Sequence, residues 1–322
     1  MSIKVYASHN LNAEIREGSS AGGLFTLIAE NIIKAGGVVY GVAFDNEWHI
    51  THQRVDNTKD LPRLRGSKYA FSIIGNTLHN ISKDLEEERP VLFSVTPCQA
   101  AAVRKRFGKK PKLLIIEVVC HGAPEHKYWI EYLHAVLMKR KKHLKDIESI
   151  SFRDKTEGWK NYSFSISFKD GSWYREHYLD NLYMRAFLKN YTLRPACFKC
   201  GYKYPEGSKA DITLGDFWGI ERISPEIDND KGTSIAIAGT AKGEGYATLF
   251  KNPTLIKLSS LESHNPAIFN SALRPIDYCE FKEKFSELKL KGNPEILKLF
   301  KRYAARPILL TIKNKFQRLL NR

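Results

Sequence analysis

The sequence predicts an α/β fold of the mixed α+β kind, with a parallel βαβ core, antiparallel strands and a helical C-terminal part. Residues 89–95 and 112–119 are short apolar, β-branched runs between chain breakers, which is typical of buried strands. Residues 99–107 between them have helical spacing, so the three segments form a βαβ unit whose strands should be parallel. Residues 147–178 instead contain three runs that alternate apolar and polar side chains, as half-exposed antiparallel strands do.

The other elements extend this pattern along the chain. Further helices are expected at residues 24–34 and 181–190, and further strands at 38–44, 210–216 and 233–240. Beyond about residue 260 the chain is predicted to be mostly helical and to end in a basic tail.

Composition and charge define the broad class of protein. Of the 322 residues, 43% are hydrophobic, which is enough core for one large domain or two ordinary ones. The N-terminal sequence lacks the apolar centre of a signal peptide, and no apolar run has the length of a membrane span, so we expect a cytoplasmic protein. The net charge of +16 favours nucleic acid, an anionic membrane or anionic ligands as partners, and a solvated basic surface is the alternative.

The C-terminal tail carries seven lysines and arginines from Lys301 onward and no acidic residue. Ile308, Leu309, Ile312 and Phe316 lie near helical spacing between these cations, a pattern that predicts peripheral contact with an anionic membrane. A helix packed on the core with a basic end is the alternative interpretation.

Four of the five cysteines form a candidate metal set. Cys98 and Cys120 each follow a strand of the βαβ unit, at the sheet edge where such folds bind ligands. Cys197 and Cys200 form a C-x-x-C pair. Four thiolates hold either zinc or an iron–sulfur cluster, and the spacing favours the cluster, with free buried cysteines as the alternative. Cys279 has no partner in spacing and is predicted to be a packed thiol.

Short segments rich in glycine and small polar residues point to a cofactor site. Glycines allow close backbone approach to a ligand, and the helix start after residues 20–23 could bind phosphate. Each segment alone is typical of a turn and none is a dinucleotide fingerprint, but together they favour a dinucleotide or flavin site. The segments are residues 19–26, 65–72, 94–99, 212–219 and 229–236.

Several single residues are candidates for chemistry. His121 follows Cys120 and could tune a cluster or move protons, or it could be a packed histidine. Lys68 adds a positive charge to its segment. Asp211 and Asp216 could bind ribose hydroxyls or cap turns. Residues 153–162 are interpreted as a solvated loop rather than a substrate contact.

Seven motifs in order make the chain resemble the coenzyme F420 hydrogenase/dehydrogenase beta-subunit family between about residues 15 and 240. The motifs are SSAGGLFT, GSKYAFS, TPCQAAAV, VVCHGAP, LRPACFKCGYK, DITLGDFWG and KGTS. The resemblance implies a flavoprotein domain over residues 1–275, with FAD and one 4Fe-4S cluster, followed by a helical basic tail at 276–322.

The resemblance also implies roles for individual residues. The cluster would be held by Cys98, Cys120, Cys197 and Cys200. Independently of the resemblance, His121 and Lys68 are the candidates for catalysis. The flavin would be surrounded by Ser20, Gly22, Gly23, Thr26, Ser67, Lys68, Tyr69, Thr96, Gln99, Asp211, Thr213 and Asp216. The family's best-known partner is coenzyme F420, and some members are encoded among surface-polysaccharide biosynthesis genes.

The chain departs from many relatives because no ferredoxin-like cysteine runs precede Cys98. We therefore expect an external ferredoxin or reductase to supply electrons to the cluster. The cluster would pass them to FAD, which would reduce a small-molecule or sugar-linked substrate. The alternative is a tetra-cysteine zinc protein with a basic surface for nucleic acid or membrane, although no nucleic-acid-binding fold is recognised.

Overall fold

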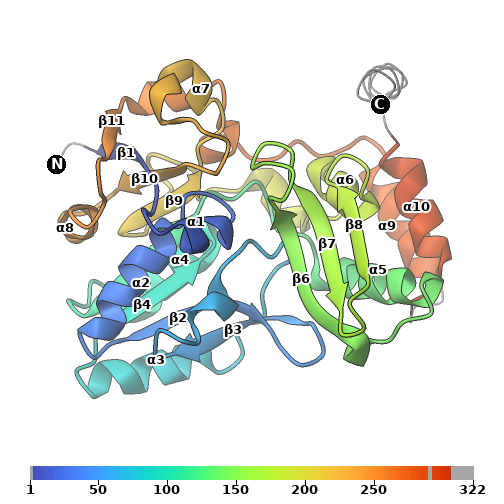
Figure 1. Ribbon diagram of the computed structural model, residues 1–322, viewed down its shortest axis with the longest axis horizontal. Helices are drawn as coiled ribbons and strands as arrows, with labels where there is room; N and C mark the ends of the chain where they lie inside the picture. Colours follow the sequence, from blue (N-terminus) through green and yellow to red (C-terminus); the bar gives the residue numbers. More distant parts are fainter. Residues whose placement is uncertain (1–2, 289–291, 306–322) are drawn as a thin grey trace.

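The computed structural model describes residues 3–288 and 292–305, and its strands form two sheets (Figure 1). The eight-stranded sheet has the order β11-β1-β10-β9-β5-β4-β2-β3, and the three-stranded sheet has the order β6-β7-β8. The large sheet contains β1 (Lys4–Ser8), β2 (Val38–Phe44), β3 (Ile50–Val55), β4 (Val91–Val95), β5 (Leu113–Val118), β9 (Ile212–Asp216), β10 (Ser234–Ala238) and β11 (Thr254–Ile256). The small sheet contains β6 (Ile147–Asp154), β7 (Ser163–Phe168) and β8 (Trp173–His177).

The helices connect and cover these sheets. They are α1 (Ala13–Glu17), α2 (Leu24–Lys34), α3 (Thr77–Glu86), α4 (Pro97–Phe107), α5 (His126–Lys139), α6 (Leu182–Leu188), α7 (Ile220–Ile223), α8 (Ala241–Ala247), α9 (Tyr278–Glu287) and α10 (Glu295–Tyr303).

The centre of the large sheet is the predicted parallel βαβ core. β4 and β5 pair in parallel from Val91↔Leu113 to Val95↔Glu117, and α4 connects them. β2 pairs in parallel with β4, and β9 with β5, whereas β3, β1, β10 and β11 pair antiparallel with their neighbours. The mixed α/β fold class is confirmed, and the carboxyl ends of four parallel strands lie at one edge.

Both faces of the central strands are buried because neighbouring residues on a strand point to opposite faces. Val91 packs with Ile81 of α3 and Val103 of α4 on one face. Leu92 packs with Ile28 of α2 on the other face. This two-sided burial explains why β4 and β5 are continuous apolar runs.

The small sheet belongs to a second core that is rich in aromatic residues. Trp129 of α5, Phe164 of β7 and Tyr183 of α6 are buried together. Phe281 of α9 and Phe300 of α10 join the same core, and Figure 1 shows these helices beside α5 and α6. The chain after residue 276 is therefore packed as far as the structure describes it.

The predicted membrane contact of the C-terminal tail concerns Ile308, Leu309, Ile312 and Phe316, which lie outside the described residues. Within the described part of the chain, every helix is too short or too polar to cross a membrane.

A buried histidine in the large sheet predicts acid sensitivity. His52 of β3 is 8% exposed, packs edge-on against Phe93, and burial lowers its pKa to about 4. The unfolded chain binds this proton near pH 6.5, so it holds more protons than the folded chain between about pH 6.5 and 4. We expect the burial of His52 to lower the free energy of unfolding by roughly 3 kcal/mol as the pH falls through this window.

The measurement is urea unfolding at pH 7 and pH 4.5 for the wild type, His52→Gln and a control, His79→Gln. His79 is exposed on α3. The His52 variant should lose part of the pH dependence that the wild type and the control retain. Identical pH profiles for all three proteins would contradict the prediction.

Candidate functional site

A cavity of about 600 Å³ lies at the carboxyl edge of the parallel strands. The segments after β4 and β5 and the end of β9 form one wall, and the loops at residues 19–25 and 64–70 form another. Arg153, Tyr162 and Tyr178, at or next to the ends of the antiparallel strands, also line it, as do residues 187–188 and 264–267. The cavity therefore lies between the two cores and takes residues from both.

Most residues expected at a cofactor site line this cavity. They are Ser20, Gly23, Ser67, Lys68, Tyr69, Thr96, Gln99, Cys120, His121 and Asp216. The loops that carry them contact each other, because Ser20 Oγ accepts a hydrogen bond of 2.6 Å from the Ser67 backbone N–H. Motifs far apart in the sequence thus meet around one space.

Asp211 and Thr213 do not line the cavity. Asp211 Oδ2 accepts hydrogen bonds from the Ile115 backbone N–H at 2.9 Å and from Arg104 at 3.1 Å. Thr213 Oγ1 donates to the buried carboxylate of Glu117 at 2.8 Å. Both side chains hold neighbouring elements of the fold together.

Gly22 and Thr26 also lie outside the lining. A Cβ on Gly22 would lie 2.8 Å from the Ser8 carbonyl oxygen, so glycine allows the loop to approach β1 closely. Thr26 Oγ1 accepts a hydrogen bond of 3.2 Å from Arg65, which itself lines the cavity. Their contribution to the cavity is to position the residues that line it.

Two helix starts border the cavity and differ in how they are capped. Thr96 and Gln99 form a capping box at the start of α4, so their side chains satisfy backbone groups of that helix. The start of α2 follows Gly23, which has φ 81° and provides no side-chain cap. Leu24 and Phe25, in the first turn of α2, line the cavity. This helix end suits an anionic group because its first N–H groups have no intrahelical partner.

Lys68 has a structural role as well as a place in the lining. Its ammonium group donates hydrogen bonds to the carbonyl oxygens of Arg65 at 2.7 Å and of Arg63 and Gly66 at 3.2 Å. Burial lowers its pKa to about 7. The Lys68 side chain is therefore held in place, and its pKa lies near neutral pH.

His121 lines the cavity in a defined orientation. Its Nε2 lies 2.6 Å from Asn190 Oδ1, and its ring packs edge-on against Phe187. Burial lowers its pKa, so the neutral ring is favoured near neutral pH. Because an amide oxygen accepts, the proton lies on Nε2, which leaves Nδ1 as an acceptor.

The four candidate cysteine ligands lie in one neighbourhood beside this cavity. Cys98 is the second residue of α4, Cys120 follows β5, and Cys197 and Cys200 lie on and after a short 3-10 helix, Pro195–Lys199. Burial is the largest cause of a pKa of about 12 for Cys120, and the charges of the other three thiols also contribute to this increase. The sequence thus brings the four thiols together from three segments.

Some local groups oppose the effect of burial and stabilise negative charge on sulfur. The Ala123 backbone N–H donates to Cys197 Sγ at 3.4 Å, and Thr96 Oγ1 lies 3.4 Å from Cys98 Sγ. The ammonium of Lys203 donates to the Cys120 carbonyl oxygen at 2.7 Å. The donor chemistry fits a thiolate-bound centre.

The four thiols do not surround a site for a single metal ion. Across residues 3–288 and 292–305, no group of three or more histidine, cysteine or acidic side chains is arranged to hold a metal ion. Binding a single ion would therefore require the thiols to rearrange, as is common when ligand binding completes a local fold.

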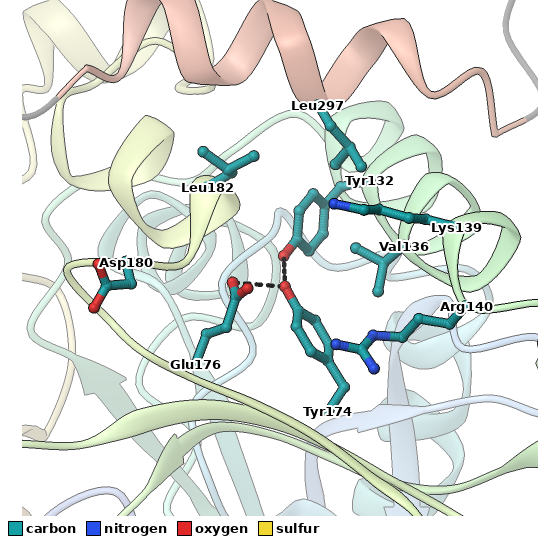
Figure 2. A pocket seen from close by; sticks show the side chains of 9 residues that line it. All are labelled: Tyr132, Val136, Lys139, Arg140, Tyr174, Glu176, Asp180, Leu182 and Leu297. Carbon is teal, nitrogen blue, oxygen red and sulfur yellow. Dashed lines mark hydrogen bonds between the residues drawn. The ribbon is translucent and has the colours of Figure 1, made fainter.

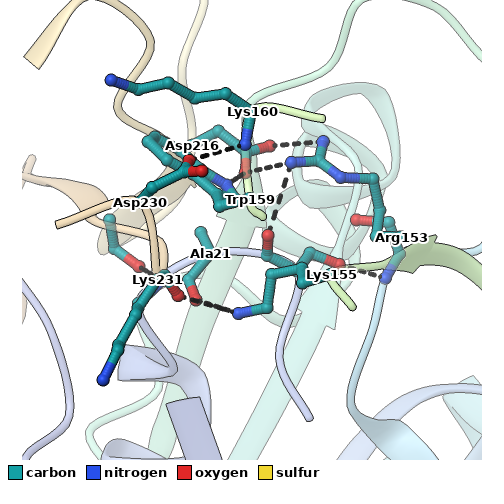
Figure 3. Close-up of polar contacts among 12 residues, drawn as sticks. Ala21, Arg153, Lys155, Trp159, Lys160, Asp216, Asp230 and Lys231 are labelled. Carbon is teal, nitrogen blue, oxygen red and sulfur yellow. Dashed lines mark hydrogen bonds and ion pairs between the residues drawn. The ribbon is translucent and has the colours of Figure 1, made fainter. Parts of the chain in front are cut away.

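Arg153 is a cavity residue that sequence analysis placed in a solvated loop. Its side chain is 3% exposed and forms two hydrogen bonds with Asp216, at 3.0 and 3.2 Å (Figure 3). The guanidinium lies 3.9 Å from the ring centre of Tyr162 and 5.0 Å from that of Trp218. The pair joins the antiparallel sheet to the end of β9.

A second buried cation supports the loops next to Arg153. Lys155 donates to the carbonyl oxygens of Arg16 at 2.6 Å, Lys231 at 3.0 Å and Ala21 at 3.4 Å (Figure 3). Burial lowers its pKa to about 8. These bonds hold the loop before α2 against the loop before β10.

A separate polar cavity of about 410 Å³ lies within the second core, away from the cysteines. Figure 2 shows Tyr132, Tyr174 and Glu176 linked in a row, with hydrogen bonds of 3.1 and 2.7 Å. Asn181, which is completely buried, donates to Tyr132 at 2.7 Å. These hydroxyl groups are occupied by bonds within the core, and sequence analysis predicted no site there.

Comparisons with known proteins give a family match and similar solved structures. Residues 88–264 match the family model that describes the C-terminal part of the beta subunit of coenzyme F420 hydrogenase/dehydrogenase. A chain of the xenon-derivatised F420-reducing [NiFe] hydrogenase complex from Methanosarcina barkeri shares the fold at a TM-score of 0.51 and 18% identity. The alignment covers 93% of this chain and 88% of that chain. No curated protein matches the sequence.

Proposed function

The chain belongs to the coenzyme F420 hydrogenase/dehydrogenase beta-subunit family, and from this premise we propose that it is an iron–sulfur flavoprotein oxidoreductase. The family name supports the oxidoreductase class. The observation that carries the cofactor assignment is the convergence of four cysteines from three segments beside a large cavity.

An iron–sulfur cluster is the proposed occupant of the cysteine site. Cys98, Cys120, Cys197 and Cys200 would be its ligands. The Ala123 N–H group that points at sulfur and the nearby Lys203 would stabilise thiolate charge. Cluster assembly would link the three segments that carry the thiols and so stabilise the fold.

FAD is the proposed occupant of the cavity. A volume of about 600 Å³ lies within the range of cofactor sites, roughly 300–1,000 Å³. The uncapped start of α2 at Gly23 would bind the diphosphate, with Arg65 as a positive neighbour. When bound, FAD would supply the exchange between single electrons and a hydride.

Three residues of the chain have proposed roles in this chemistry. His121 would accept or hold a proton at Nδ1, because Nε2 is committed to Asn190. Lys68, with a pKa of about 7, would place a positive charge or a transferable proton at the rim. Arg153, held by Asp216, would orient polar groups of a bound ring and exclude water.

The proposed substrate is a small or sugar-linked molecule with a polar ring. Tyr162 and Tyr178 stack with ring centres 4.3 Å apart, and both line the cavity beside Arg153. Aromatic faces next to a guanidinium suit such a ligand. A role in surface-polysaccharide biosynthesis follows as a proposal, with coenzyme F420 as the other candidate co-substrate.

Anaerobic purification tests the cofactor assignment directly. We expect a brown protein with about four iron and four sulfide per chain and about one FAD. Iron and sulfide assays, a visible spectrum and extraction of the flavin are the measurements. A colourless protein that binds zinc after reconstitution would contradict the proposal and favour the tetra-cysteine zinc interpretation.

A substrate screen separates the two candidate acceptors. The reduced flavin would be mixed without oxygen with oxidised coenzyme F420 and, separately, with nucleotide-linked keto sugars. Reoxidation of the flavin by a sugar but not by F420 would support the sugar-linked substrate. Reoxidation by F420 alone would contradict it.

A further inference from the structure

Two large apolar side chains are fully or largely exposed on one loop near the C-x-x-C pair. Ile276 is fully exposed and Leu273 is 84% exposed. These are the highest values among the exposed large hydrophobic side chains of the described residues. Single exposed apolar residues are common, but two on one ordered loop, with the exposed Leu188 nearby, indicate a contact surface.

The loop that carries these residues is held in place by the C-x-x-C segment. Ser271 Oγ accepts from the Cys200 backbone N–H at 3.0 Å and donates to the Cys200 carbonyl oxygen at 3.2 Å. Phe198, within the C-x-x-C pair, packs edge-on against Tyr278 with ring centres 4.9 Å apart. The exposed side chains are therefore presented next to Cys200 by a defined structure.

The same loop is connected to the cavity through one asparagine. Asn190 follows α6 in a left-handed conformation, with φ 71°. Its Nδ2 donates to the Leu273 carbonyl oxygen at 2.8 Å, and its Oδ1 lies 2.6 Å from His121 Nε2. One side chain therefore separates the exposed loop from a residue that lines the cavity.

Positive charge surrounds the apolar residues. Lys189, Lys199 and Arg274 are exposed on the three segments that meet here. Two acids lie nearby: Asp277 accepts a hydrogen bond from the Tyr191 hydroxyl at 2.7 Å, and Glu280 forms an ion pair with Arg302. An apolar centre with a cationic border complements a partner whose surface is acidic around an apolar centre.

We propose that this surface is the docking face for a small, acidic one-electron carrier protein, an inference that rests on the proposed iron–sulfur function. The docking face consists of Leu188, Lys189, Lys199, Leu273, Arg274 and Ile276. The carrier loses one electron here and the centre held by the cysteines gains it. Its contact is small and transient, as electron-transfer encounters are, and its rate of association depends on salt.

Binding to the full-length, reconstituted protein tests the docking face without relying on turnover. An acidic bacterial ferredoxin is titrated calorimetrically at about 50 mM and about 300 mM salt. We expect Kd to rise several-fold with salt. The charge variant Lys199→Glu with Arg274→Glu, and the apolar variant Leu273→Ser with Ile276→Ser, should each weaken binding about tenfold.

A matched pair at the far edge of the large sheet serves as the control. Leu255 of β11 is 67% exposed and Lys251 is exposed beside it. Leu255→Ser with Lys251→Glu should leave Kd unchanged. Equal weakening by control and docking-face variants, or no weakening by either, would overturn the proposal.

Two further measurements assign any failure to its cause. Dithionite should reduce the proposed cysteine-bound centre equally in all variants, because a small chemical reductant needs no docking face. Iron and sulfide contents test the proposed iron–sulfur function separately. A chain that ends at Ala305 should bind the carrier as tightly as the full chain. Loss of binding on this truncation would assign the contact to the tail and overturn the docking face.

Discussion

Replacing Cys197 by serine is expected to abolish stable iron–sulfur loading. A serine hydroxyl is a poor ligand for iron at neutral pH, and three thiols hold a four-iron cluster weakly. Cys197 also accepts the Ala123 N–H bond, so the variant loses a contact that positions the segment. Iron and sulfide should fall to a small fraction of the wild-type content, with loss of the brown absorbance.

The fifth cysteine provides the control for this experiment. The prediction that Cys279 is a packed thiol is wrong, because Cys279 is exposed on α9, where its sulfur accepts a hydrogen bond from Arg274 at 2.5 Å. Cys279→Ser should therefore retain full iron, sulfide and flavin. Circular dichroism of both variants would separate cluster loss from unfolding. Equal cluster content in Cys197→Ser and the wild type would exclude Cys197 as a ligand.

Replacing Asp216 by alanine is expected to have the largest effect on stability. The change leaves the buried guanidinium of Arg153 without its carboxylate, and such uncompensated charges cost about 3–5 kcal/mol. Trp159 also loses its 3.0 Å hydrogen bond to Asp216. Urea unfolding of the anaerobic protein measures the loss.

Two comparisons make this prediction specific. The double variant Arg153→Met with Asp216→Leu removes both charges and should recover much of the stability that the single variant loses. Asp170→Ala breaks the exposed ion pair with Lys142 and should cost only a small fraction of the loss expected for Asp216→Ala. A single Asp216 variant as stable as the Asp170 variant would contradict the proposed role of the buried pair.

The positions of two cysteines could be predicted because chain topology determines them. Once residues 89–119 are recognised as a βαβ unit, parallel pairing places Cys98 and Cys120 at one sheet edge. The helix predicted at 24–34 is confirmed as α2 (Leu24–Lys34), because its helical apolar spacing and flanking glycines are both local signals.

The role of Arg153 could not be predicted because the strand pattern is interrupted there. The register of β6 against β7 shifts between Ser151 and Asp154, so Phe152 and Arg153 are both buried although they are adjacent. Strict alternation would have exposed one of them. The sequence shows only an arginine at the end of an alternating strand. Most arginines in such positions are exposed, so this signal does not indicate burial.

The alternation of side chains along a strand also explains why only some residues of the motif DITLGDFWG line the cavity. In β9 the side chains of Leu214 and Asp216 point to the same face of the sheet and line the cavity. Thr213, and Asp211 just before the strand, point to the opposite face and form hydrogen bonds with Glu117 and with the Ile115 backbone. The helix α5 was not predicted, although it supplies Trp129 and Tyr132 to the second core. Its buried residues 128, 129, 132, 133, 136 and 137 recur at helical spacing, so a local signal for this helix is present in the sequence.

The division of the cavity between two cores has an evolutionary consequence. The cysteines and the glycine-bearing loops come from the parallel-strand layer and its extensions, whereas Arg153, Tyr162 and Tyr178 come from one continuous stretch of chain, 147–178. Changes within that stretch can alter the shape and charge of one wall while the opposite wall, with its cysteine and glycine-bearing loops, stays intact. If the proposed function holds, the two walls could therefore change independently, and the same cysteine-bearing scaffold could accommodate different ligands.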